Sequence, residues 1–505
     1  MGARRLFVLV SALALAFSLL PATAGAADGL TYEQFENGTK TDNVEVLKRI
    51  GFTGATEIDA DGRYAYVGQF SGKYDRNTID QGGLYIIDMV GDEDTEPFTV
   101  VSKLECTGTD NYIRLMDPAV FNPDEPEKQY VVMAHHGNRC NARDLRNDPN
   151  TQAGYGAFNG IMVIDVTDRA NPVIVDSIGH ESAHTVMPHP TRPYLYILPG
   201  GTANGINTGR RRISPTGIID ASNPTDLKYI TAFQHNAQGC HDLGWTPDGD
   251  YAYCAGIGEI QVWDVSGDRI ENPLVVNTIV NPAIQFAHNA VLSDDGKYLL
   301  INDEAFGFHT CRGDAADLYG SLWIYDVSIP NLPILAGRIE PPGHPKGSGQ
   351  VNTAGWVTEW CAAHNYNFVP GTYTVVASWF GGGMTAHDIT DPLNPELVAQ
   401  YMPGGDSVMW SAHYYNGYVL TGDMGLGVDI LDIPELREAE AAAAATGAPE
   451  GAGSGDAMFG AGLSLGAPRI DRTAELVPAV LPPRPVVERG IGESGFCVVP
   501  GNRNT

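Results

Sequence analysis

Short apolar runs alternate with turns along most of the chain. The stretch QFAHNAVLSDDGKYLLINDE, residues 285–304, has an apolar run, an Asp-Asp-Gly turn and a second apolar run. That pattern predicts a strand, a tight turn and an antiparallel strand. Similar hairpins are predicted in the segments ATEIDADGRYAYVG, HTVMPHPTRPYLYIL, HDLGWTPDGDYAYCAG and HNYNFVPGTYTVVAS. We therefore expect a chain built mainly of β-hairpins.

A second pattern follows each hairpin. An apolar strand ends in aspartate, a few polar residues and usually Asn-Pro come next, and another apolar strand begins, as in IMVIDVTDRANPVIVDSI. The aspartate can accept hydrogen bonds from the backbone of the turn, and proline starts the next strand without needing a donor. The pattern occurs seven times, at Asp88, Asp165, Asp220, Asp264, Asp326, Asp388 and Asp432.

Hairpin and signature together make a repeated four-stranded unit. Such units, repeated radially, form a β-propeller, so the sequence predicts an all-β, seven-bladed propeller over residues 43–433. The last unit lacks a fourth strand after Ile433, whereas an extra apolar segment, residues 43–52, precedes the first unit. That segment could complete the last blade and close the ring. The alternative is a simple edge strand beside the first blade.

The aspartate signatures resemble those of the LVIVD-repeat family of bacterial surface and exported proteins, which is named for this pattern. The resemblance covers roughly residues 45–433, by the repeat reasoning above. It implies a propeller. It implies no particular activity, because propellers host many functions.

The two ends of the chain have other compositions. Arg4 and Arg5, an apolar run and Ala24-Gly25-Ala26 predict a signal peptide over residues 1–26, with a loose likeness to a twin-arginine signal. The run is too short for a lasting membrane span, and no later segment approaches that length. We expect an exported protein, extracellular, on the cell surface or periplasmic, with no transmembrane segment. Residues 434–505 predict a short helix, a linker and a mostly disordered low-complexity tail.

Charge and cysteine content narrow the picture. The formal net charge is −30, which disfavours nucleic acid and anionic membrane surfaces as partners. There are seven cysteines and no CxxC spacing, so disulfides are favoured over a thiolate zinc site in an exported protein. Their places in the repeat predict three bridges and leave Cys497 over: Cys106–Cys140, Cys240–Cys254 and Cys311–Cys361.

Histidines recur at one position of the repeat. When the hairpins are aligned on the tyrosine that opens their second strand, five consecutive units carry histidine near the start of the first strand: His184, His241, His288, His364 and His413. The second unit places Asp117 there, and the first has Gly54 or Thr56. The first strand of a propeller blade is the innermost, so equivalent positions should form a ring around the central axis.

A candidate outer tier lies at the end of the second strand. Counting five residues past the opening tyrosine adds His135, Asp303 and Asp423 on the same face. Long loops should also emerge on this face, and binding sites are commonly built there. Converging imidazoles are suited to a transition metal, which could be copper, iron, zinc or manganese. Asp303 or Asp423 could then orient the imidazoles.

Two functions remain open at this stage. The first is an exported metal-binding propeller acting as a metalloenzyme, with redox or metal-assisted lyase or hydrolase chemistry at the histidine ring. The alternative is a non-catalytic surface propeller that binds a protein or carbohydrate, in which each histidine makes a structural hydrogen bond within its blade. A small molecule or a carbohydrate would be the ligand class. The sequence indicates neither a substrate nor an oligomeric state.

Overall fold

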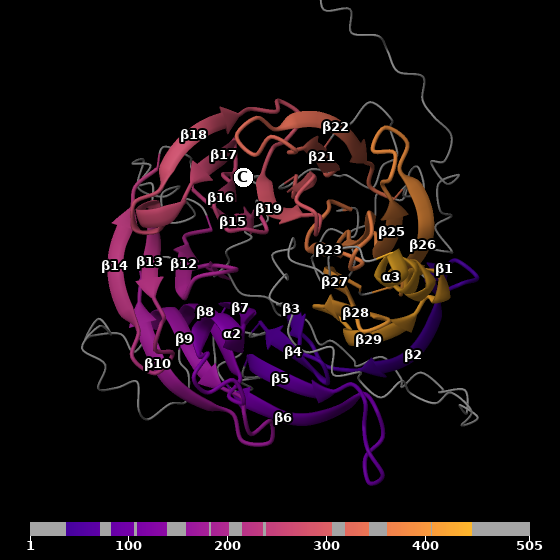
Figure 1. Ribbon diagram of the computed structural model, residues 1–505. Coiled ribbons are helices and arrows are strands. Elements are labelled where there is room, and N and C mark those ends of the chain that lie inside the picture. The colour runs from indigo at the N-terminus through magenta and orange to yellow at the C-terminus, as the bar shows by residue number, and fades with distance from the viewer. Residues whose placement is uncertain are drawn as a thin grey trace, which may run out of the picture.

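Seven antiparallel sheets are arranged as blades in a closed ring (Figure 1). The computed structural model describes residues 37–70, 82–105, 109–138, 158–180, 183–200, 215–235, 239–305, 319–342, 361–405 and 407–446. Six blades have four strands in sequence order from the centre outward, and the sixth adds a fifth strand; in the seventh blade the outermost strand comes from the N-terminal segment. The predicted all-β, seven-bladed propeller is therefore confirmed.

The strands of the first four blades follow in order. The first blade has β3 (Ala55–Ala60), β4 (Tyr64–Gln69), β5 (Gly83–Asp88) and β6 (Thr99–Glu105). The second has β7 (Thr109–Met116), β8 (Tyr130–Asn138), β9 (Phe158–Asp165) and β10 (Val173–Gly179). The third has β11 (Thr185–Pro188), β12 (Tyr194–Leu198), β13 (Thr216–Asp220) and β14 (Lys228–Phe233). The fourth has β15 (Asp242–Trp245), β16 (Tyr251–Ala255), β17 (Ile260–Asp264) and β18 (Leu274–Ile279).

The remaining blades complete the ring. The fifth has β19 (Ala287–Leu292), β20 (Tyr298–Asp303), β21 (Leu322–Asp326) and β22 (Ile334–Ile339). The sixth has β23 (Tyr366–Phe368), β24 (Thr374–Ser378), β25 (Met384–Asp388), β26 (Glu396–Met402) and the short β1 (Thr39–Lys40). The seventh has β27 (Met409–Tyr415), β28 (Tyr418–Asp423), β29 (Gly427–Asp432) and β2 (Glu45–Ile50).

The repeated aspartates form the predicted turns. In six blades the carboxylate at the end of the third strand accepts a hydrogen bond from the backbone N–H two residues on: Asp88, Asp165, Asp220, Asp264, Asp326 and Asp388. The apolar faces of neighbouring blades then pack against each other. Tyr253 and Val262 of the fourth blade, for example, share a buried cluster with Leu299 and Ile301 of the fifth.

The N-terminal segment closes the ring as predicted. Strand β2 pairs antiparallel with β29, from Glu45 opposite Asp432 to Ile50 opposite Val428. A buried ion pair fastens it, because Arg49 Nε donates to Asp429 Oδ1 at 2.6 Å and Arg49 Nη2 donates to Asp429 Oδ2 at 2.8 Å. The last blade thus joins the two ends of the propeller through backbone pairing and a two-pronged guanidinium contact.

We expect Arg49→Lys to weaken this closure. Lysine keeps the charge but loses the planar fork, so at least one charged hydrogen bond to Asp429 is lost. The free energy of unfolding should fall by about 1.5–3 kcal/mol, measured by urea denaturation. Arg269→Lys is the control, since the Arg269–Asp264 pair is on the surface and should change stability by at most about 1 kcal/mol. Equal effects of the two substitutions would contradict the prediction.

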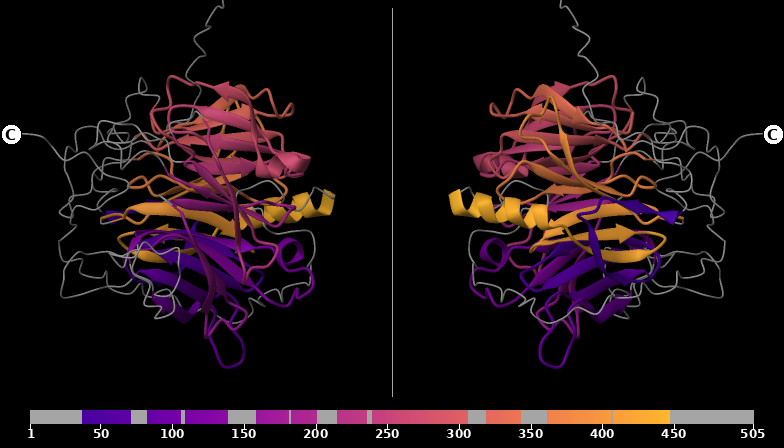
Figure 2. Two further views of the ribbon diagram at one scale, coloured as in Figure 1. Left: turned by 90° about the vertical axis from the view of Figure 1, so that its left-hand side faces the viewer. Right: turned by 90° about the vertical axis from the view of Figure 1, so that its right-hand side faces the viewer.

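Helices are few. A single-turn α-helix, α2 (Pro118–Phe121), and a 3-10 turn, η3 (Gly267–Glu271), lie between strands. Helix α3 (Pro434–Thr446) follows the last blade as expected and projects away from one face of the ring (Figure 2), with Leu436 buried against the propeller. Among the described residues, no helix has the length and apolar character needed to cross a membrane. The predicted signal peptide, residues 1–26, and the tail from residue 447 lie outside the described residues.

Candidate metal centre

Four histidines from four consecutive blades lie side by side at the centre. The ring centroids are 4.3 Å apart between His184 and His241, 4.0 Å between His241 and His288, and 4.2 Å between His288 and His364. All four are buried, and His184 has the largest exposed fraction, 6%. The structure thus brings together four of the five histidines that the repeat position singled out.

The propeller geometry explains why these side chains meet. The backbone N–H groups of His184, His241 and His364 donate to carbonyls at the end of the second strand of the same blade. Each histidine therefore stands where an inner strand begins. His288 takes the equivalent place in β19, inside an irregularity of the pairing between Ala287 and Ala290. Inner strands surround the axis, so equivalent positions in successive blades become neighbours (Figure 1).

His413 is not in this row, and the prediction that it completes the ring is wrong. It lies further along β27, opposite Leu420, and its Nε2 is 3.4 Å from Glu57 Oε1. Trp410 takes the place beside His364 instead, at 4.3 Å between ring centroids. The tight turn at Asn416, which has a positive φ of 47°, shortens this hairpin, so the position equivalent to the row is Trp410, eight residues before Tyr418. His413 is only five residues before Tyr418, whereas the row histidines are nine or ten before their tyrosines.

Asp117 is also misplaced by the sequence alignment. It follows the end of β7, not the start, and its carboxylate caps helix α2 by accepting from the N–H of Ala119 at 2.8 Å. Helix α2 lengthens this hairpin, so counting from the tyrosine falls at the wrong end of the strand. Asp117 lies at the opposite end of its inner strand from the histidine row.

The candidate outer tier has another role. Asp303 accepts backbone hydrogen bonds from the loops on either side: Gln285, Phe286, Ala305 and Gly320. Asp423 accepts from three backbone N–H groups and one hydroxyl: Val408, Gly425, Leu426 and Ser407. Burial raises the pKa of Asp423 to about 6. These carboxylates fix loop geometry, and their hydrogen bonds go to the loops instead of to imidazoles. His135 is buried in β8, opposite Gly160.

Glu304 is the functional candidate that sequence reasoning missed. It is the residue after Asp303 and is fully buried, with its Oε2 3.8 Å from His288 Nε2. One ligand atom from each of His241, His288 and Glu304 lies within 4.8 Å of the other two, so this group could hold a metal ion. The pair Asp303-Glu304 was visible at the end of a buried strand. Counting five residues past Tyr298 selected Asp303, whose carboxylate faces the loop backbone, and not Glu304.

The imidazoles are held in the form that binds a metal. His364 Nδ1 lies 2.6 Å from the carbonyl oxygen of Trp410, so Nδ1 carries the proton and Nε2 keeps its lone pair. Among the described residues, His364 Nε2, His241 Nδ1 and both ring nitrogens of His288 are buried without a hydrogen-bond partner. Burial lowers the pKa of His364 to about 3 and that of His241 and His288 well below the usual range. Neutral imidazoles with unused nitrogens are suited to metal coordination.

A polar network lies across the axis further along the inner strands. Arg114 Nη1 donates to Glu57 Oε1 at 2.6 Å, and the side chain of Asn365 donates to Glu57 and to the hydroxyl of Tyr112. These residues come from the first, second and sixth blades, so the contacts span the axis. Burial raises the pKa of Asp242 to about 7, although Arg114, 4.0 Å away, opposes the shift.

Backbone strain gathers at the same place. Few non-glycine residues in the described chain have a positive φ, and three of them border the centre: Ile257 at 68°, Ala305 at 45° and Phe380 at 44°. Ala305 follows Glu304, and the Phe380 ring lies 4.6 Å from that of His364. Conformations of this kind cost about 1–3 kcal/mol each and cluster at functional sites. Backbone strain of this kind is typical of a functional site, where the positions of the side chains matter more than the stability that the strain costs.

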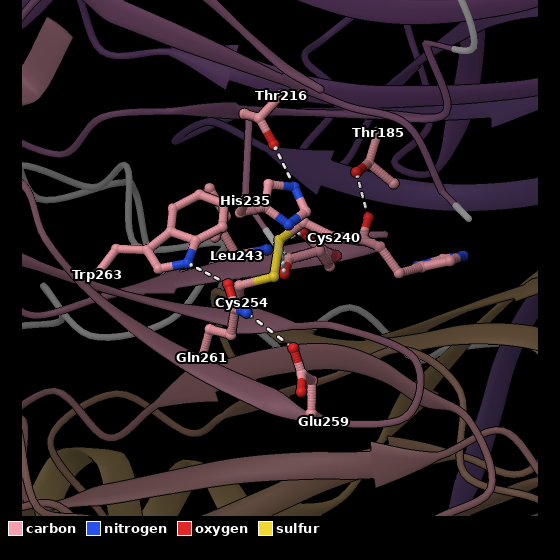
Figure 3. Close-up of a disulfide and its surroundings, with 11 residues drawn as sticks. Thr185, Thr216, His235, Cys240, Leu243, Cys254, Glu259, Gln261 and Trp263 are labelled. Atoms are coloured by element: carbon pink, nitrogen blue, oxygen red, sulfur yellow. Dashed lines mark hydrogen bonds between the residues drawn. A yellow bond between two sulfur atoms is a disulfide. The ribbon is translucent and has the colours of Figure 1, made fainter. Parts of the chain in front are cut away.

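The disulfide Cys240–Cys254 supports the same region. Cys240 directly precedes His241, and the bridge ties it to β16 with 5.5 Å between the Cα atoms (Figure 3). This confirms one of the three predicted pairs. Cys361 is also disulfide-bonded. The remaining cysteines of the predicted pairs and Cys497 lie outside the described residues.

We expect the double variant Cys240→Ala with Cys254→Ala to lose about 3 kcal/mol of unfolding free energy, because the bridge closes a loop with a sequence separation of 14. Urea denaturation with and without reductant checks this. Reductant should lower the stability of the parent protein more than that of the double variant. A variant as stable as the oxidised parent would contradict the expectation.

Comparison with known proteins shows likeness in fold only. No family model matches the chain, and no curated protein matches it. One similar solved structure is the β-propeller domain of Myceliophthora thermophila Cps50 (Swd1), at 11% identity over 77% of this chain and 99% of that one, with a TM-score of 0.47. Another is a functionally unknown protein of Desulfotomaculum acetoxidans, at 13% identity over 72% and 92%, with a TM-score of 0.47. A third is a putative 6-phosphogluconolactonase of Bacteroides uniformis, at 12% identity over 73% and 92%, with a TM-score of 0.48.

Proposed function

We propose that this chain is an exported metalloprotein whose metal centre lies in the histidine row. The observation that carries the proposal is the convergence of His241, His288 and Glu304 within 4.8 Å in a fully buried place. Two imidazoles and a carboxylate that converge in this way are the donor types that a transition metal binds. Packing alone would not favour three polar side chains here.

The donor set favours a transition metal and a catalytic role. Two imidazoles and one carboxylate are the ligands of non-haem iron oxygenases and of hydrolytic zinc sites, which keep further coordination positions open for substrate or water. The metal could thus serve redox chemistry or act as a Lewis acid in a lyase or hydrolase reaction. His364 is the next imidazole along the row and could supply a third nitrogen through Nε2. His184 ends the row on the other side.

The buried charge also favours a divalent cation. Three carboxylates, Glu57, Asp242 and Glu304, and one guanidinium, Arg114, are buried along the inner strands next to the row. Burial raises the pKa of Asp242 to about 7, so the count rests on Glu57 and Glu304, which when ionised outnumber the one guanidinium by one; the neutral histidines do not change that sum. An uncompensated charge in such a place is strongly unfavourable. A divalent ion would offset this excess of negative charge.

Export remains part of the proposal. The signal-like N-terminus, the disulfide of the fourth blade and the LVIVD-like repeats all support it, and disulfides persist mainly in oxidising compartments. The ligand class stays as proposed from the sequence, a small molecule or a carbohydrate.

Metal analysis of the purified full-length protein tests the function. We expect about one divalent transition ion per chain, retained on dialysis without added metal and replaced after chelation by only some of copper, iron, zinc and manganese. Protein that is folded, contains no metal and cannot be loaded with any of these four ions would overturn the proposal. The surface propeller that binds a protein or carbohydrate would then be the better description.

A further inference from the structure

The two sides of the histidine row differ in chemistry. On the side where the inner strands begin, aromatic rings border the imidazoles: Phe286 lies 5.4 Å from His241, and Phe380 and Trp410 lie 4.6 and 4.3 Å from His364, between ring centroids. Beyond the row in the other direction, the Arg114–Glu57 pair and its partners span the axis. We call Phe286, Phe380 and Trp410 the aromatic collar.

The collar stands at the open edge of the blades. Phe286 directly precedes β19, Phe380 follows β24, and Trp410 lies near the start of β27. Inner strands begin and second strands end at the same edge of an antiparallel blade. Phe286 and Phe380 therefore lie beside the row towards this edge, whereas Trp410 lies in line with the row, next to His364. A ligand that approaches the row from this edge would meet Phe286 and Phe380 before the metal.

Phe380 is held in the collar against its own backbone preference. Its φ of 44° is rare for a bulky residue, and the three residues that follow are all glycine. Glycine at position 380 would remove the strain, yet the chain places an aromatic side chain there. The carbonyl of Phe380 accepts from the N–H of Met409, which fixes this residue between the sixth and seventh blades. The turn would favour glycine at this position, so the presence of phenylalanine is explained by its aromatic ring.

The collar has almost no polar groups. Phe380 is 1% exposed and Trp410 is 2% exposed, so both rings lie in a nearly dry environment. The indole N–H of Trp410 is buried without a hydrogen-bond partner among the described residues. It would offer one donor to a bound molecule. An anion passing this wall would lose its hydration without gaining a cationic partner, which is strongly unfavourable.

We propose, on the basis of the proposed metal centre, that the collar selects a small uncharged ligand for the metal, of the size and polarity of dioxygen, and excludes anions. Phe380 is the residue that sets this specificity. The apolar wall admits a neutral molecule at little desolvation cost, and the charged Arg114–Glu57 network lies across the axis on the other side of the row. The centre thus binds neutral diatomic molecules in preference to charged ligands of similar size.

Iron-loaded protein gives a direct test, with nitric oxide as the neutral probe and azide as the anionic one. Nitric oxide should give the paramagnetic resonance signal of an iron–nitrosyl complex, whereas azide should bind weakly. In Phe380→Gly the backbone strain is relieved and the ring is gone, so azide binding should tighten by about tenfold or more, equivalent to about 1.4 kcal/mol. Nitric oxide binding should change much less.

Phe380→Leu is the matched variant, because it keeps an apolar side chain on the same backbone and should exclude azide as the parent does. This variant also tests the proposal if Phe380→Gly fails to fold. Tight binding of azide to Phe380→Leu would contradict the proposal. Azide binding the parent as tightly as Phe380→Gly, or iron-loaded parent that does not bind nitric oxide, would overturn the ligand selection while leaving the metal centre in place. A parent that cannot be loaded with metal would overturn the centre itself.

Discussion

Replacing His288 by phenylalanine should abolish metal binding and leave the propeller folded. His288 is fully buried, and both of its ring nitrogens lack hydrogen-bond partners among the described residues. Phenylalanine fills a similar volume and leaves no polar atom to satisfy, so the metal-free protein should lose little stability. Loss of a ligand should weaken metal binding by more than about 100-fold, since even loss of an outer partner of a ligand costs 10–100-fold.

Glu304→Gln should act in the same direction. The change is nearly isosteric, but it removes the negative charge and the better donor atom for a divalent ion. Metal content after dialysis and thermal unfolding of the chelated proteins give the two readings for each variant. Bound metal unchanged in both variants, or a large loss of stability in chelated His288→Phe, would show that the row is structural.

His189 offers a contrasting control. It is as buried as His288, but its Nε2 lies 2.8 Å from the carbonyl oxygen of Gly249, and its Nδ1 accepts from the N–H groups of Thr191 and Arg192. His189→Phe should therefore lower the stability, because several buried groups lose their partner. It should leave the metal content unchanged. The two histidines should thus show opposite patterns of metal loss and stability loss.

The fold was predictable because it is repeated. Seven copies of one strand-and-aspartate pattern predict seven blades even if one copy is misread, and the missing last strand predicts closure by residues 43–52. The histidine row was predictable for the same reason, since four blades place histidine at one repeat position. Where a hairpin differs in length, the count fails. The helix after Asp117 shifts the alignment to the wrong residue, and His413, only five residues before its tyrosine, stands too far along its strand to join the row.

The rest of the site has no repeat behind it. Glu57, Arg114 and Asn365 come from three different blades and share no spacing, so only the closed ring brings them together. Glu304 differs from Asp303 by one position in a strand, which decides whether the carboxylate meets loop backbone or imidazole. The sequence could indicate that a site exists at this face. The choice of the carboxylate and the polar network across the axis depended on the three-dimensional register.

Arg114→Met should cause the largest loss of stability in this protein. The guanidinium is 2% exposed at its side chain and Glu57 is fully buried, so methionine would leave a carboxylate without its cation in the centre of the ring. Removing one partner of a buried ion pair costs about 3–5 kcal/mol. Arg114→Met combined with Glu57→Gln should recover most of this loss, because Glu57 no longer carries a charge and Asp242, without Arg114 to lower its raised pKa, takes up a proton at neutral pH. Urea denaturation of the single and double variants at neutral pH measures both effects.

The pH dependence separates this charge effect from simple loss of packing. In the parent, burial acts to raise the pKa of Glu57, but Arg114 and His413 hold it at about 2, below its ordinary value of 4.5. The pair therefore contributes stability above pH 4.5 and loses it as the pH falls towards 2. In Arg114→Met, burial dominates and the pKa of Glu57 lies above its ordinary value, so the stability of the variant rises as the pH falls and Glu57 takes up a proton.

The deficit in the stability of the variant, relative to the parent, should be largest at neutral pH and shrink towards pH 4. A deficit independent of pH would assign the loss to the missing side-chain volume instead of the unpaired charge.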